Sequence, residues 1–197
     1  MGKIEQELLR NKRIRDKIVN LREGLGFSIS EKKIYLLTSY FSIAIEHHAA
    51  IDLLIEERYY GSGFALLRSL AETFYRAAWV NACATSQQLE RLVTEDNFEF
   101  PKDMMEKTDT AYASGDFFKN IRRKSWKSMC SYAHSGLLQI TRQHGAEDGL
   151  IGPNYSDEEI LEVLRGSTAF LVILSVLFFR STGHPNEATE IKKLAGV

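Results

Sequence analysis

Apolar residues recur at intervals of three and four along almost the whole chain, and no segment alternates between apolar and polar with a period of two. Only three prolines interrupt the 197 residues, so long windows remain in which a helix can continue unbroken. Apolar residues make up 44% of the chain and charged residues 26%, a balance that excludes wholesale disorder. The sequence therefore predicts an all-α fold.

Caps and stop signals divide the chain into a bundle of four main helices with short accessory helices. Helices are expected at about residues 4–21, 28–59, 64–83 and 156–180, with short ones at about 86–93, 102–112 and 186–194. Another helix is expected to begin near Asp116 or Lys119, with a break around Ser135 and Gly136. Two Ser-x-x-Glu capping boxes begin at Ser28 and Ser156. Gly61 and Gly63 predict a tight turn that folds the second and third helices into an antiparallel hairpin. We expect one domain, 1–197, with an N-terminal helix (1–24), a core bundle (28–181) and a short C-terminal helix (184–197).

Charge and cysteine content limit the location and the partners. The 25 basic and 26 acidic residues create no overall field that would favour nucleic acid or an anionic membrane. Cys83 and Cys130 follow no metal or redox spacing, which favours reduced thiols. The charged N-terminus resembles no secretory signal, and the longest apolar stretch, residues 168–179, is too short to span a bilayer and predicts a buried core helix. We therefore expect a cytoplasmic protein with no membrane partner and no cofactor.

The first candidate cluster contains two histidines in the second long helix. His48 falls on the apolar stripe of this helix and should point inward, with His47 beside it. His48 and Asp52 are four residues apart and could reach one metal ion. The chain nevertheless lacks the Glu-x-x-His pairs of di-iron bundles and the His-Glu-x-x-His motif of zinc hydrolases, so we expect no metal site. His48 is then either a hydrogen-bonded structural residue or part of a ligand-binding site.

The second cluster lies on the third long helix. Arg68, Glu72 and Arg76 are spaced by four and form one narrow stripe on a helix that is apolar almost all round. Burying two guanidinium groups beside one carboxylate is costly without pairing. The stripe is either an Arg-Glu-Arg ladder that holds neighbouring helices in register, or a charged pocket for a phosphate, a nucleotide or an acidic group.

The third cluster is a basic run that contains Trp126 and is followed by His134. A basic run with an aromatic residue can follow a phosphate backbone, although such runs are also common on solvated helix faces. His134 precedes a helix-weakening Ser-Gly pair and could serve as a general base, with Lys127 beside it, or it could cap the helix break together with Tyr132. The basic residues are Lys119, Arg122, Arg123, Lys124 and Lys127.

The same segments carry a resemblance. Four segments resemble, in order, the sequences of a bacterial family of unknown function. They are EHHAAIDLL, GSGFALLRSLAETFYRAAW, SWKSMCSYAHSG with Gln139, and PNYSDEEILEVLR. Its members share His-His-x-x-Ile, Leu-Arg-x-x-x-Glu and Tyr-x-His-x-Gly motifs, and the match covers about residues 36–165. This resemblance implies no established activity.

More distantly, the helical layout is similar to the HEPN superfamily, which includes ribonucleases of toxin–antitoxin, abortive-infection and CRISPR systems that act as dimers. The HEPN signature is an Arg followed, after four to six residues, by a His. Here Lys127 stands at that place before His134, so the chain departs from the signature.

Three functions remain open. The favoured one is a helical ligand- or partner-binding protein, in bacterial defence or stress response, that holds an anionic small molecule, a protein partner or RNA. The second is a metal-independent ribonuclease toxin that uses His134 and Lys127. The third is a structural homodimer that works through its first or last helix. The ligand-binding residues of the favoured function are Arg68, Glu72, Arg76, His47, His48 and Tyr132.

Overall fold

The computed structural model describes residues 1–26, 30–96, 98–144 and 151–196. Its regular structure is helical throughout, apart from one isolated bridge between His144 and Ile151, so the all-α prediction is confirmed for the described residues. The helices are α1 (Lys3–Glu23), α2 (Lys32–Glu56), α3 (Tyr60–Ala82), α4 (Ser86–Thr94), α5 (Met104–Tyr112), α6 (Phe117–Ala133), α7 (Leu137–Thr141), α8 (Asp157–Ser181) and α9 (Pro185–Ala195).

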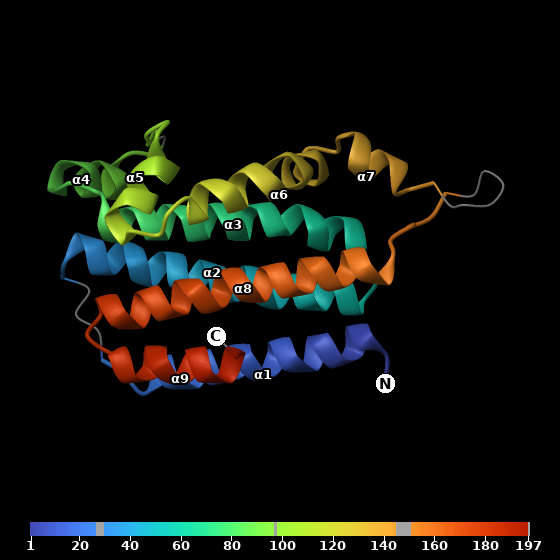
Figure 1. The fold of residues 1–197 in the computed structure, drawn as a ribbon, viewed down its shortest axis with the longest axis horizontal. Helices are drawn as coiled ribbons and strands as arrows, with labels where there is room; N and C mark the ends of the chain where they lie inside the picture. The colour runs from blue at the N-terminus through green and yellow to red at the C-terminus, as the bar shows by residue number, and fades with distance from the viewer. Residues whose placement is uncertain (27–29, 97, 145–150, 197) are drawn as a thin grey trace.

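The long helices run nearly parallel to one axis and stack in layers (Figure 1). Helices α2 and α3 form the antiparallel hairpin that the sequence predicted, and α8 packs against both of them. Helix α1 lies against α2 and α8, and α9 folds back along α8 and α1. Helix α6 lies on the opposite side of α3 (Figure 1). It has 17 residues, so it is a fifth long helix beside the four main helices expected. Thus α3 is enclosed between the α2–α8 layer and α6.

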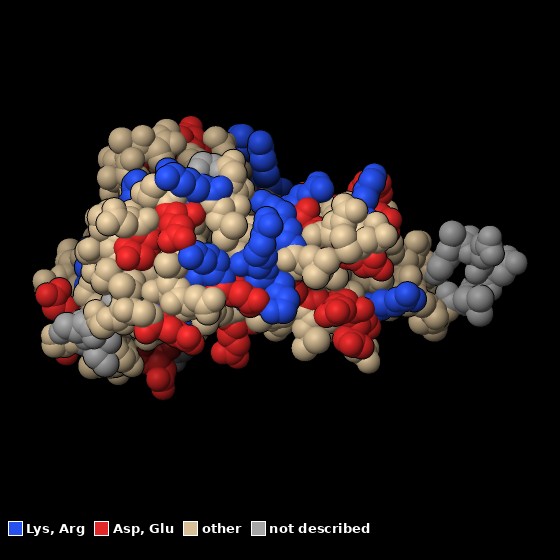
Figure 2. All heavy atoms as spheres, turned by 90° about the horizontal axis from the view of Figure 1, so that it is seen from below, with Lys and Arg blue, Asp and Glu red and all other residues tan. Residues whose placement is uncertain are grey.

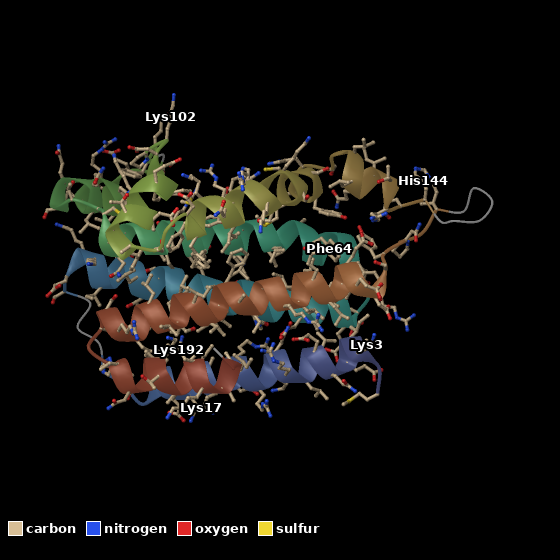
Figure 3. All side chains as sticks on the ribbon, viewed as in Figure 1. Lys3, Lys17, Phe64, Lys102, His144 and Lys192 are labelled. Carbon is tan, nitrogen blue, oxygen red and sulfur yellow. The ribbon has the colours of Figure 1, made fainter. Side chains whose placement is uncertain are left out.

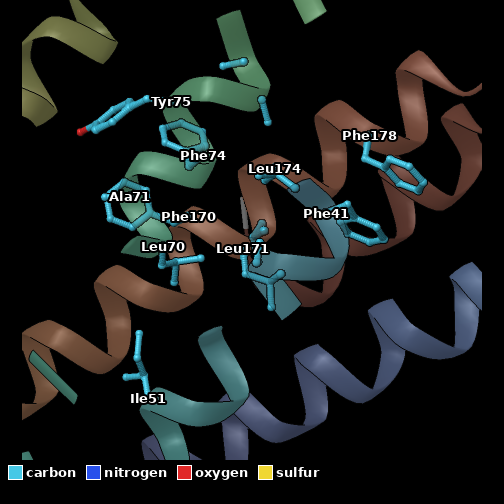
Figure 4. Close-up of a cluster of buried hydrophobic side chains, with 14 of the residues drawn as sticks. Phe41, Ile51, Leu70, Ala71, Phe74, Tyr75, Phe170, Leu171, Leu174 and Phe178 are labelled. Atoms are coloured by element: carbon cyan, nitrogen blue, oxygen red, sulfur yellow. The ribbon is translucent and has the colours of Figure 1, made fainter. Parts of the chain in front are cut away.

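Aromatic side chains join these layers in the core (Figure 4). Phe74 of α3 lies 5.2 Å, between ring centroids, from Phe170 of α8 and 5.4 Å from Phe118 of α6. Phe41 of α2 stacks on Phe178 of α8 at 4.2 Å. All five rings are at least 90% buried, so they account for much of the apolar area that stabilises the bundle.

The turn between α2 and α3 lies earlier than predicted. Gly61 and Gly63 belong to the first turn of α3, and the chain reverses at residues 57–59, where Arg58 has a φ of +63°. Gly63 is instead a packing residue, because a Cβ atom there would lie 3.1 Å from Cδ1 of Ile55. The prediction of a Gly61–Gly63 turn was therefore wrong, although the hairpin itself is present.

Two other local predictions are confirmed and one lies outside the described residues. The Oγ atom of Ser156 accepts a hydrogen bond from the N–H of Glu159, so this capping box opens α8. Helix α6 ends at Ala133, and α7 begins at Leu137 after Ser135 adopts a φ of +52°. Ser28 lies outside the described residues, and α2 begins at Lys32 with Glu31 as its N-cap.

Helix α8 is longer than the apolar stretch that marked it in the sequence. Within the described ranges it is the one helix that is long and apolar enough to cross a membrane, so the argument from a twelve-residue length was wrong. Of its most apolar window, 61% is buried inside the bundle, as in the core helix of a folded domain. Burial rather than length supports the prediction of a core helix here.

Candidate functional site

The contact between α3 and α6 brings two of the three candidate clusters together. Arg68 and Glu72 follow each other at a spacing of four on α3, and Trp126, Cys130 and His134 do so along α6 and its C-cap. Residues four apart share one helix face, so the two rows face each other where α3 and α6 pack. The guanidinium carbon of Arg68 lies 4.4 Å from the centroid of the Trp126 ring.

Hydrogen bonds hold the Arg68 side chain between the two helices. Its Nε and Nη2 donate to Oε1 of Glu72 at 3.2 and 2.8 Å. Its Nη1 donates to Sγ of Cys130 at 2.8 Å and lies 3.1 Å from Nε2 of His134. A guanidinium can only donate, so Nε2 of His134 must accept. The imidazole is therefore neutral in this arrangement, with its proton on Nδ1.

The Arg-Glu-Arg stripe forms a half-exposed seam. The side chains of Arg68, Glu72 and Arg76 are 20%, 31% and 44% exposed. Arg76 lies 3.9 Å from Glu72 and over the ring of Phe100, at 4.8 Å from its centroid. The structure thus places the three residues in one row, as the spacing predicted, but solvent reaches all of them. The cost of burying two guanidinium groups beside one carboxylate is therefore reduced by solvent at this site.

The basic run surrounds Trp126 on α6. Between Phe117 and Ala133 the helix has five cations and no acid. Arg122 is half-buried, and its guanidinium carbon lies 4.7 Å from the centroid of the Trp126 ring. Lys119 forms an ion pair of 2.8 Å with Asp116. The side chains of Arg123, Lys124 and Lys127 are exposed.

The two histidines of α2 lie elsewhere, and His48 contacts side chains of α1 and α8. His48 is completely buried, and its Nε2 lies 3.0 Å from Oγ1 of Thr168 on α8. That hydroxyl already donates to Asn11 at 2.6 Å, so the His48 ring must donate through Nε2. Nδ1 then accepts from Nη1 of Arg15, at 3.0 Å. Arg15 also forms an ion pair with Asp52, whose other oxygen accepts from Asn11 at 3.0 Å.

Burial sets the protonation of this cluster. It lowers the pKa of His48 to about 3, and the charge of Arg15 acts in the same direction. Burial also raises the pKa of Asp52, although hydrogen bonds from Asn11 and Arg15 oppose the shift. Both ring nitrogens of His48 are engaged with side chains of the chain itself. The geometry therefore fits the structural alternative for His48. His47 is half-buried beside it, and burial lowers its pKa too.

Tyr132 lines a different cavity, of about 290 Å³, between α3, α6 and α8. Its ring contacts Phe64 at 5.0 Å between centroids. Arg142 and Glu159 form an ion pair at the same cavity. Burial raises the pKa of Tyr132, and Arg142 opposes this shift. Tyr132 is therefore not a neighbour of Arg68 in the way that His134 is.

Several participants were not identified from the sequence. Asn11 and Arg15 of α1 and Thr168 of α8 complete the buried cluster, and Cys130 contacts Arg68. One signal existed for Asn11, since it lies on the same face of α1 as the buried Ile14 and Ile18. In the part of the chain that the structure describes, no group of three or more His, Cys, Asp or Glu side chains is placed to hold a metal ion.

Comparison with known proteins gives one relationship. The sequence profile of a family of unknown function, DUF6988, matches residues 41–196. No curated protein and no solved structure matches the chain. The matched region contains α3, α6, α8 and the C-terminal part of α2, and with them the whole α3–α6 contact. The chain therefore belongs to DUF6988, a family of unknown function.

Proposed function

We propose that the α3–α6 face binds single-stranded RNA through its phosphate groups. One observation carries this proposal: two guanidinium groups, of Arg68 and Arg122, lie over the ring of Trp126 on a helix that has five cations and no acid. Guanidinium groups held in place by a ring lose less conformational freedom when a phosphate binds. Cations close to an aromatic side chain are typical of surfaces that follow a single strand.

The opposite side of the bundle has a different charge pattern. Figure 2 shows the face that carries α1 and α9, where basic side chains near the middle are flanked by acidic ones. Ion pairs account for part of this mixture, among them Lys17 with Glu190 at 2.6 Å and Arg165 with Glu7 at 3.1 Å. Helix α6 differs because Arg123, Lys124 and Lys127 expose their charges with no acid on the same helix. The electrostatic attraction for phosphate should therefore be local to α6.

The test is binding of a fluorescently labelled oligouridylate, measured by anisotropy at low and at physiological salt. Replacing both Arg123 and Lys127 by Glu should weaken binding by about tenfold or more and reduce its salt dependence, because two phosphate contacts are lost. A matched control reverses Lys3 and Arg13, two exposed cations of α1, with the same change in net charge. Equal losses in both variants, or no binding by the wild type at low salt, would contradict the proposal.

A second candidate function is metal-independent cleavage of the bound RNA, as the HEPN resemblance implies. The contact of 3.1 Å between Arg68 and His134 supports it, because cleavage needs a base beside a cation. A phosphate that draws the Nη1 of Arg68 away would free the Nε2 of His134. This nitrogen takes the proton of a ribose 2′-hydroxyl, and the 2′-oxygen attacks the adjacent phosphorus. The bond from phosphorus to the 5′-oxygen breaks, and that oxygen takes a proton from solvent, while Lys127 contacts the phosphate.

The products distinguish cleavage from binding alone. We expect 2′,3′-cyclic phosphate ends from the wild type and none from His134→Ala, while His134→Ala still binds the oligonucleotide. Expression in a bacterial host adds a second readout: growth arrest that His134→Ala abolishes would support a toxin in the cytoplasm. Cleavage that persists in His134→Ala would exclude His134 as the base. Binding without cleavage by the wild type would leave the first proposal standing and reject the second.

A further inference from the structure

Helix α8 carries a stripe of residues on its outer side, of which Ile173 and Val176 are partly buried against the core. In Figure 1 this helix crosses the front of the bundle. Residues spaced by three, four and seven share one face of a helix, and seven such residues of α8 are exposed or half-exposed. In chain order they are Glu158, Glu162, Arg165, Ala169, Ile173, Val176 and Arg180.

The chemistry of this stripe changes in a regular way along the helix. Acids occupy its N-terminal end, Arg165, which pairs with Glu7, follows them, small and apolar residues run from Ala169 to Val176, and Arg180 occupies its C-terminal end. Glu158 and Arg180 are each eleven residues from Ala169, which corresponds to about 16 Å on either side. The stripe is therefore complementary to itself when two copies run antiparallel with Ala169 at the centre.

Antiparallel packing sets opposite charges against each other. Arg180 of one copy would lie opposite Glu158 of the other, one helical turn from Glu162, and the same contact would recur across the two-fold axis. A parallel arrangement would instead place Glu158 on Glu158 and Arg180 on Arg180. Like charges in register oppose association, so the charge order selects the antiparallel pairing.

The shape of the surface also suits a second helix. Ala169 is small, and a Cβ atom added to Gly166 would meet no atom within 4 Å. Two shallow grooves, of about 670 and 610 Å³, both reach Arg165 and Ala169. The second groove includes the apolar side chains of Phe117 and Ile173. A helix that approaches at small residues can place its larger side chains into such grooves. Figure 3 shows Lys3 and Lys192, one from each groove, on the α1–α9 side of α8.

We propose that this α8 stripe is the interface of a homodimer whose second copy lies antiparallel across Ala169. The isologous pairing buries Ile173 and Val176 of both copies and joins Glu158 and Glu162 to the partner's Arg180. From the sequence, the dimer interface was expected at the first or the last helix. The proposed interface lies on α8 instead. It is independent of RNA binding, which uses α3 and α6.

The first test is the mass of the protein in solution, measured by light scattering after size-exclusion chromatography over a range of micromolar concentrations. The wild type should be a dimer. Ala169→Arg places two guanidinium groups opposite each other and should weaken dimerisation by more than about tenfold. Ala133→Arg, at an exposed alanine of α6, is the matched control and should remain dimeric. A monomeric wild type would overturn the proposal, and so would a dimer that Ala169→Arg leaves unchanged. If the monomer instead sediments with lipid vesicles, the stripe binds a membrane and the proposal is also overturned.

Charge exchange tests the orientation, even if Ala169→Arg fails to fold. One variant carries Glu158→Arg with Glu162→Arg, and the other carries Arg180→Glu. Each variant alone should be monomeric, because equal charges then meet across the axis. A mixture of the two should form a heterodimer, in which every contact is again between opposite charges. Failure of the mixture to associate would overturn the antiparallel pairing.

Discussion

Asp52→Ala should lower the free energy of unfolding by about 3 kcal/mol, because it leaves the guanidinium of Arg15 partly buried without its counter-charge. The side chains of Arg15 and Asp52 are only 16% and 9% exposed, so solvent cannot replace the lost partner fully. Asn11 also loses an acceptor for its side-chain amide. The measurement is urea unfolding followed by far-ultraviolet circular dichroism.

Asp16→Ala is the control for this prediction. It removes another ion pair that involves α1, between Lys12 and Asp16, but both side chains are more than half exposed. Exposed ion pairs contribute between zero and about 1 kcal/mol, so the control should be nearly neutral. Equal effects of the two substitutions would show that the α1–α2–α8 cluster is not a buried unit.

His48 should make the stability of the protein depend on pH. Its pKa in the folded state is about 3, well below the ordinary value of 6.5, so the unfolded chain binds the proton more readily. The contribution of neutral His48 to the free energy of unfolding is complete above pH 6.5 and is lost progressively as the pH falls toward 3. At pH 5 the loss should reach about 2 kcal/mol relative to neutral pH. Urea unfolding at a series of pH values measures it.

His48→Gln separates this effect from the titration of carboxyl groups. Glutamine keeps a donor for Thr168 but cannot take up a proton in this range. The loss of stability between pH 7 and pH 5 should therefore be much smaller in the variant than in the wild type. An identical pH dependence in both proteins, or an NMR titration of His48 near pH 6.5, would contradict a neutral buried imidazole.

The helices were predictable from the sequence because their signals are local. Periodicity located α1, α2, α3 and α8, and the Ser156 capping box marked the start of α8. The position of the turn before α3 was not predictable in this way. The glycines suggested a turn only because their backbone is free to adopt one. Glycine is needed at position 63 because Ile55 of α2 packs close to it. This contact depends on the tertiary structure, and no local sequence pattern predicts it.

The candidate sites divide in the same way. Spacing along one helix correctly aligned Arg68 with Glu72 and placed His48 on the buried face of α2. The contact of Arg68 with His134 joins residues 66 positions apart, and that of His48 with Thr168 joins residues 120 apart. Such contacts depend on which helices pack together. Local patterns in a single sequence do not predict that packing. For the same reason Tyr132, only two residues before His134, lines a different cavity.

Fluorine NMR of protein labelled with 5-fluorotryptophan tests most directly whether the α3–α6 face binds RNA. The chain has two tryptophans: Trp79 is 1% exposed in the core, and Trp126 lies under Arg68 and Arg122. Trp126→Phe assigns the two resonances. Addition of an oligouridylate should shift the Trp126 resonance in a saturable way that added salt reverses, while the Trp79 resonance stays in place. A Trp126 resonance that does not move at low salt would contradict the account.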